Sequence, residues 1–285
     1  MGIVLGANEY GKAETRLVRV DREGDRHTLH DLNVSVALRG DLDGTHLTGD
    51  NATVLPTDSM KNTVYVFARR YGVGQIEDFG LRLARHFVDS QPSIGAARVS
   101  IEEYGWTRLG PHSFARDGGE TRTAVLTYDG RESWAVGGLH GLVLLNSTDS
   151  EFWGYVKDEY TTLPETRERV LATAVAASWR FGTVPDDWAD TNAGVRADLV
   201  EAFVETYSRS LQQTLYQMGR RVLENRPEVV EVRLSLPNRH HLLVDLAPFG
   251  QDNPNEVFVA ADRPYGLIEG TVLRDDAPPA GLAWW

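Results

Sequence analysis

Two adjacent histidines, His240 and His241, could do chemistry because imidazole binds metal ions and transfers protons. On a strand, neighbouring side chains point to opposite faces, so the two rings cannot both bind one ion. The chain has no cysteine, and no acidic residue stands at a ligand spacing from the pair. The pattern therefore argues against a metal site, and we expect none. Strand alternation instead puts His240 on the face of Leu242 and Val244, with His241 pointing away from that face.

A second motif, residues 6–12, matches a phosphate-binding loop at all but its last position. Ala13 stands where a serine or threonine would bind magnesium, and residues 15–20 have the pattern of a strand rather than of a helix. Residues 72–74 supply two glycines of a dinucleotide fingerprint and lack the third. Neither nucleotide motif is complete, but Lys12 remains a candidate for chemistry.

The first half of the chain predicts two strands, a helical region and two more strands. The helical region has a possible cap at residues 57–59 and an apolar face with spacings of three and four residues over 76–87. The predicted strands cover residues 12–20, 27–38, 98–106 and 121–128. Paired strands of this kind indicate antiparallel hairpins.

The second half repeats this order. One apolar stripe over residues 195–222 predicts a single long helix. We expect strands at residues 134–145, 170–181, 230–236 and 240–246, with a turn at Pro237 and Asn238 between the last two. The fold class predicted is α+β, with two domains at residues 1–130 and 131–285. The duplication is one of topology and not of residues.

Composition limits the partners. The chain has 285 residues, a net charge of −12, 41% hydrophobic and 25% charged residues. This balance disfavours binding to nucleic acid or to an anionic membrane surface, and no apolar run is long enough to span a membrane. The sequence has no signal-peptide pattern, so a cytoplasmic protein is expected. An anionic substrate would need a local cation to overcome the overall charge.

The sequence resembles the urate oxidase family in six blocks that occur in the family's order. The blocks are TDSMKNTVY at 57–65, EFWGY at 151–155, DEYTTL at 158–163, Glu165-Thr166 with Arg169, SLQQTLY at 210–216, and SLPN with His240 at 235–240. They span nearly the whole chain, whereas residues 104–119 are less similar to the family.

The resemblance implies a fold and an activity. The fold is two tandem tunnelling-fold domains, with antiparallel sheets and helices on one face, which close barrels between subunits of a homotetramer. The activity is oxidation of urate by molecular oxygen and water to 5-hydroxyisourate and hydrogen peroxide, without a cofactor. Sites in this family lie at subunit interfaces. Alternatives are another tunnelling-fold purine or pterin enzyme, or a catalytically silent purine-binding scaffold.

The resemblance also assigns substrate-binding residues. Urate is flat and anionic, so Phe152 would supply a stacking surface, Arg169 a planar cation and Gln212 an amide that donates and accepts. The family pattern adds the backbone groups of Asp58 and Leu211, and the side of Leu163, to the substrate contacts. Each of these side chains alone has a simpler interpretation as a core, surface or helix-flank residue.

Four residues are assigned by the resemblance to the chemical step. Thr57 would relay a proton, Lys12 would act as the base and His240 would orient that lysine. Asn238 would hold oxygen, peroxide or water above the ring. Their alternatives are structural, namely a helix cap, a solvated strand residue, a buried histidine and a turn residue. The final residues, 282–285, lack the peroxisomal import tripeptide, which favours a bacterial-type cytoplasmic enzyme.

Overall fold

The computed structural model describes residues 2–22 and 24–285, and it divides into two compact units. The first unit comprises Met1–Gly138, Asp186–Ala189 and Pro278–Trp285. The second comprises Leu139–Pro185 and Asp190–Ala277. Each unit has its own core of buried apolar side chains.

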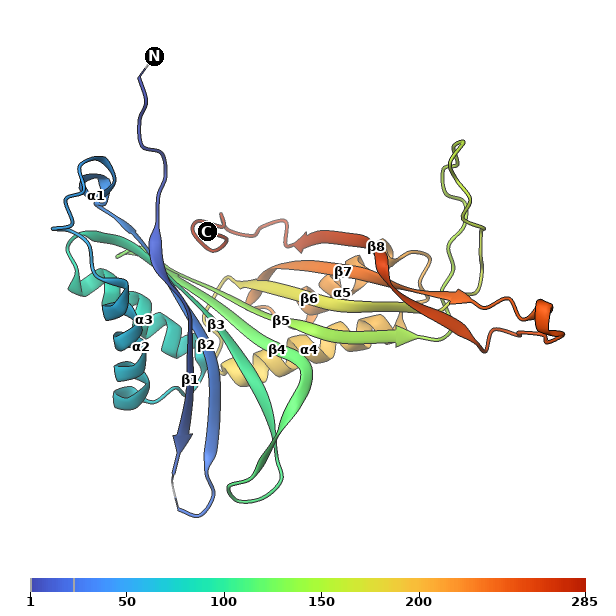
Figure 1. Ribbon diagram of the computed structural model, residues 1–285, viewed down its shortest axis with the longest axis horizontal. Coiled ribbons are helices and arrows are strands. Elements are labelled where there is room, and N and C mark those ends of the chain that lie inside the picture. The colour runs from blue at the N-terminus through green and yellow to red at the C-terminus, as the bar shows by residue number, and fades with distance from the viewer. Residues whose placement is uncertain (1, 23) are drawn as a thin grey trace. The chain divides into compact units, whose positions relative to one another are not determined.

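The first unit has four antiparallel strands in chain order, with helices between the second and third (Figure 1). Its elements are β1 (Tyr10–Asp21), β2 (Thr28–Gly40), α1 (Asp43–Leu47), α2 (Thr57–Tyr71), α3 (Ile76–Ser90), β3 (Ile94–Arg108) and β4 (Phe114–Tyr128). Alternate residues of β2, from Leu32 to Leu38, are buried in one core with Phe79 and Phe87 of α3. Period-two burial on the strand and helical burial on α3 therefore produce one helix-covered face.

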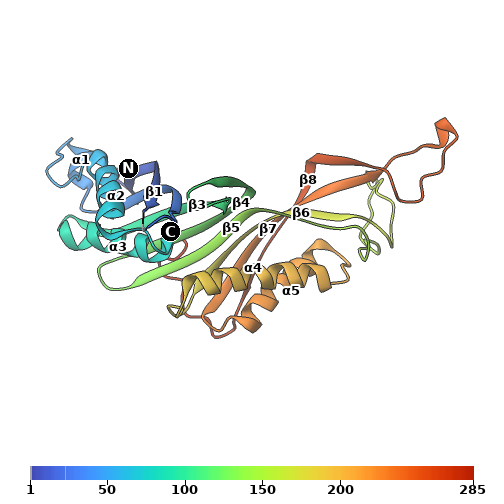
Figure 2. The same ribbon diagram turned by 90° about the horizontal axis from the view of Figure 1, so that it is seen from below.

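The second unit repeats this plan. Its elements are β5 (Ser133–Asn146), which begins in the first unit, then β6 (Leu171–Phe181), α4 (Trp188–Glu205), α5 (Leu211–Asn225), β7 (Val229–Leu243), the 3-10 turn η1 (Ala247–Phe249) and β8 (Phe258–Leu273). Figure 2 shows α4 and α5 on one face of these strands. Trp179, Phe203 and Met218 are fully buried in the core between them.

The predicted long helix was wrong, because α4 and α5 are separated at residues 206–210. Within this break, the backbone of Ser208 bonds to another segment. Its N–H donates to the carbonyl of Asp149 at 2.9 Å, and its carbonyl accepts from the N–H of Glu151 at 2.8 Å. The side chain of Ser210 then caps α5 by accepting from the N–H of Gln213. Tertiary hydrogen bonds thus replace helical ones.

The predicted turn at Pro237 and Asn238 was also wrong. β7 continues through both residues to Leu243, and its return strand is β8 rather than residues 240–246. The register between β7 and β8 shifts between Asn238 and His240, which accommodates the irregular backbone there. A smaller difference is that α2 begins at Thr57 after Pro56, with no side-chain cap.

The prediction of an α+β fold with antiparallel strands is confirmed. Among the described residues, no helix is long and apolar enough to cross a membrane. Lys12 lies in β1, as expected for a segment that is not a phosphate-binding loop.

Candidate functional site

A pocket of about 630 Å³ in the second unit brings together most of the predicted site. The predicted residues that line it are Phe152, Leu163, Arg169, Leu211, Gln212, Asn238 and His240. They come from the loop after β5, the start of α5 and the middle of β7. Residues that lie far apart in the sequence therefore share one cavity.

Arg169 is the cation of this pocket. Its Nε donates to the Ser150 hydroxyl at 3.0 Å, and its backbone N–H donates to the Ser150 carbonyl at 3.0 Å. Partial burial lowers the pKa of the guanidinium. Among the described residues, no hydrogen bond or ion pair engages its two Nη atoms. The fork is thus oriented through Nε and remains available to a ligand.

Phe152 is held next to this cation. Its backbone forms a β-bridge with Thr166, with hydrogen bonds of 2.8 and 3.0 Å. The Arg169 Cζ atom lies 5.3 Å from the centroid of the Phe152 ring. Tyr155 stacks on the same ring with centroids 4.9 Å apart and planes 15° apart. The loop therefore presents an aromatic surface and a guanidinium together.

The start of α5 forms another wall of the pocket. Leu211 and Gln212 are its first two residues, and the buried hydroxyl of Thr214 donates to that of Ser208 at 2.9 Å. This contact joins α5 to the segment that bonds Asp149 and Glu151. The first N–H groups of a helix attract negative charge, and Gln212 is exposed at this end. Arg169 and the helix start together favour an anion.

β7 supplies the remaining predicted residues. Asn238 is half-buried and pairs with Thr173 of β6 on one side and with Gly266 of β8 on the other. His240 and His241 both line the pocket, so the expectation that His241 points away from the site was wrong. The register shift lies just before them, between Asn238 and His240, and pairing with β8 is regular from His240 to Leu243.

Lys12, Thr57 and Asp58 form a separate group in the first unit. Thr57 and Asp58 open α2, and Asp58 bonds to the ammonium of Lys61 and, at 2.9 Å, to the amide of Asn62. The contact with Lys61 is the main cause that lowers the pKa of Asp58, and the charge of Lys12 adds to it. These three predicted residues are not among those that line the pocket of the second unit.

Several residues contribute to the pocket although their residue types alone did not indicate it. Ser150 orients Arg169, Tyr155 stacks on Phe152, and Gly266 leaves space beside Asn238. Tyr155 is the last residue of the EFWGY block and Ser150 directly precedes it, and this block was the only available signal. Among the described residues, no cluster of three or more potential metal-ligating side chains occurs.

Fold and pocket define a class of protein. The chain has two antiparallel α+β units, and the second has a pocket with an aromatic ring, a guanidinium and a helix start. Such a pocket suits a planar anion. The family model described as Uricase matches residues 8–127 and 135–269. The chain belongs to the uricase family.

Relatives agree with this assignment. A uricase from Arthrobacter globiformis is 53% identical over 284 residues, covering 99% of this chain and 94% of the relative. A uricase from Dictyostelium discoideum is 36% identical, covering 94% of this chain and 96% of the relative. The crystal structure of the Arthrobacter globiformis uricase matches with a TM-score of 0.97 at 51% identity, over 100% of this chain and 99% of that one.

Proposed function

We propose that this protein oxidises urate with molecular oxygen and water to 5-hydroxyisourate and hydrogen peroxide, using the pocket of the second unit. The observation that carries the proposal is the fork of Arg169, whose Nη atoms no described residue engages, beside the ring of Phe152 and the start of α5. The uricase family supports the same reaction. Two electrons pass from urate to oxygen, and water adds to the oxidised ring.

Binding follows from the chemistry of the three main groups. The urate anion stacks on Phe152, and the Arg169 fork donates to adjacent acceptors at one edge of the ring. Gln212 donates to and accepts from the opposite edge. Leu163 and the backbone of Leu211 complete the wall. Because the whole chain is negatively charged, Arg169 supplies the local attraction that an anion requires.

The chemical step needs a second group of residues. We propose that Thr57 relays a proton from the attacking water, Lys12 acts as the base and His240 orients Lys12. Asn238 holds oxygen or water above the substrate, and the backbone of Asp58 contributes to the binding of urate. The chemistry uses no cofactor and no metal ion.

The first group lines a pocket in one unit, whereas Lys12, Thr57 and Asp58 belong to the other unit. We propose that a second copy of the chain unites them, in a homotetramer with its sites at subunit interfaces. β1 has a hydrogen-bonded partner strand only in β2, and β8 only in β7, among the strands of the described chain. Such open edges favour pairing between copies, which would close the barrels. We propose that residues 1–130 and 131–285 are the two tandem domains.

Urate consumption by protein dialysed against a chelator tests the proposal. We expect loss of the near-ultraviolet absorbance of urate, with one oxygen consumed and one hydrogen peroxide released per urate. A requirement for added metal or flavin would refute the cofactor-free mechanism. Binding of urate without turnover would instead indicate a silent purine-binding protein.

A further inference from the structure

The two units correspond position by position over their second long helix and third strand. α3 and α5 each have 15 residues, as do β3 and β7. The helices start at Ile76 and Leu211, and the strands at Ile94 and Val229, so one offset of 135 positions relates both pairs. The connecting turns match as well: the N–H of Ile94 donates to Gln91 at 2.9 Å, and that of Val229 donates to Arg226 at 3.1 Å.

Buried helix positions obey the same offset. Six pairs are buried in both helices: Ile76 and Leu211, Phe79 and Thr214, Gly80 and Leu215, Leu83 and Met218, Ala84 and Gly219, and Phe87 and Val222. Residue types differ within all six pairs, but the six positions are buried in both helices. The offset therefore identifies equivalent places in the two units. At the second helix position Glu77 is buried, whereas Gln212 is exposed.

Applied to the pocket, the offset gives acidic counterparts. Glu77, the second residue of α3, corresponds to Gln212, the second residue of α5. Glu103 of β3 corresponds to Asn238 of β7. Two neutral amides of the second unit are thus replaced by two carboxylates in the first.

The neighbouring strand completes the comparison. Asn238 pairs with Gly266, whereas its counterpart Glu103 pairs with Arg122. A Cβ atom built on Gly266 would lie 3.5 Å from Ile268 and 4.0 Å from Asn238, in ordinary van der Waals contact and without a clash. Where the second unit has a glycine, which has no side chain, the first unit has an arginine.

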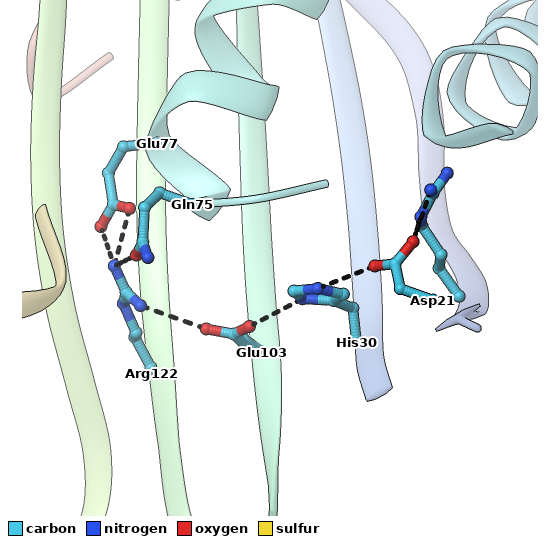
Figure 3. A network of polar contacts seen from close by, with 7 residues as sticks. Asp21, His30, Gln75, Glu77, Glu103 and Arg122 are labelled. Atoms are coloured by element: carbon cyan, nitrogen blue, oxygen red, sulfur yellow. Dashed lines mark hydrogen bonds and ion pairs between the residues drawn. The ribbon is translucent and has the colours of Figure 1, made fainter. Parts of the chain in front are cut away.

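Figure 3 shows what this arginine does. The Arg122 Nη2 atom lies 2.8 and 3.0 Å from the two carboxylate oxygens of Glu77, and 3.1 Å from Oε1 of Gln75. Nη1 lies 3.3 Å from Oε2 of Glu103. Glu77 is almost completely buried, with 3% of its side chain exposed. A planar cation is therefore held between two carboxylates, one of them in the interior.

We propose that the first unit contains a counterpart of the second unit's pocket, which the chain fills with its own guanidinium, Arg122. The two places would bind ligands of opposite charge. Arg169 and the amides of the second unit suit a planar anion, whereas Glu77 and Glu103 of the first unit suit a planar cation. Removal of the Arg122 side chain opens this counterpart to a free guanidinium or amidinium ion. The inference rests on strand register and side-chain contacts, and it does not depend on the reaction of the second unit.

Chemical rescue of the full-length variant Arg122→Ala tests this proposal. Methylguanidinium chloride is the probe, with tetramethylammonium chloride at the same concentration as the control for ionic strength. We expect the thermal midpoint of the variant to rise saturably by roughly 2–4 °C with methylguanidinium only, as for a ligand that binds the folded state. The wild-type midpoint should not rise, because Arg122 occupies the site.

Glu77→Gln combined with Arg122→Ala is the matched control, because it removes the buried carboxylate and should abolish the rescue. If Arg122→Ala does not fold, the yield of refolding in methylguanidinium against tetramethylammonium becomes the measurement. Equal effects of the two cations on midpoint or yield would overturn the proposal. So would rescue that persists without the Glu77 carboxylate.

Discussion

Arg169→Lys tests the proposed binding of urate most directly. Lysine keeps the positive charge but lacks the planar fork, and it cannot reproduce the contact from Nε to Ser150. The backbone N–H of residue 169 still donates to the carbonyl of Ser150, so the backbone conformation of the loop should not change. The substitution therefore separates charge from geometry.

The expected magnitude follows from the lost contact. A hydrogen bond to a charged group contributes about 1.5–3 kcal/mol, and about 1.4 kcal/mol corresponds to a factor of ten in affinity. Loss of one arm of the fork should weaken urate binding by roughly 10- to 100-fold. Since Arg169 is only half-buried, the lower part of this range is expected.

Initial rates of urate loss over a range of concentrations give KM, and calorimetry with a non-oxidisable purine analogue gives Kd. Arg167→Lys is the matched control. Arg167 lies in the same loop, with its Cζ atom 4.0 Å from the ring centroid of Trp153, and it is exposed. An unchanged KM and Kd for Arg169→Lys, or an equal loss in both variants, would refute the binding role.

Two further predictions concern the chemical step and the first unit. The double variant Lys12→Met and Thr57→Ala should lower kcat by at least about 100-fold, because it removes the proposed general base. Its affinity for the purine analogue should change little. Equal losses of kcat and affinity would indicate a structural role. Burial raises the pKa of the Glu77 carboxyl, against the opposing charge of Arg122. Folded Glu77 thus holds its proton more tightly than the unfolded chain, so its contribution to stability is greatest below the unfolded pKa of about 4.3 and is lost as pH rises through the folded pKa. As pH is lowered from about 7 to about 4.5, the free energy of unfolding in urea should rise more for the wild type than for Glu77→Gln. A smaller rise for the wild type would contradict the raised pKa of Glu77.

Much of the fold was predictable because burial alternates along strands and recurs along helices. The apolar faces of β2 and α3 are local patterns, and local sequence specifies them. The two helices α4 and α5 were predicted as one because Phe203, Tyr207 and Leu211 continue an unbroken stripe. Their separation depends on hydrogen bonds from Ser208 to a loop more than 50 residues away. No local pattern records such a contact.

Pro237 shows a similar limit. Proline lacks an N–H and usually interrupts a strand, which predicts a turn. Here an irregular register beside Asn238 accommodates the altered backbone, and pairing with β8 resumes at His240. The prediction was wrong about the secondary structure at Pro237, which is strand and not turn. Asn238 and His240 nevertheless both line the pocket, as expected.

The site itself was predictable only through resemblance, because Phe152, Arg169 and Gln212 have common residue types. Gly266 shows what remained hidden. Its contribution is the space it leaves, and its importance appears only when its strand partner, Asn238, is known. Arg122 was hidden for the same reason, since its meaning depends on the register that places it opposite Glu103.

The bridge between Phe152 and Thr166 has a consequence for how the loop can change its length. It fixes both ends of the excursion over residues 153–165, so the ring and cation are anchored independently of the tip. Doubling the length of a closed loop costs only about 0.6 kcal/mol. Insertions at the exposed tip, near Val156 and Tyr160, should therefore cost little stability. The tip can therefore vary in length without moving Phe152 and Arg169, the ring and the cation proposed to hold urate.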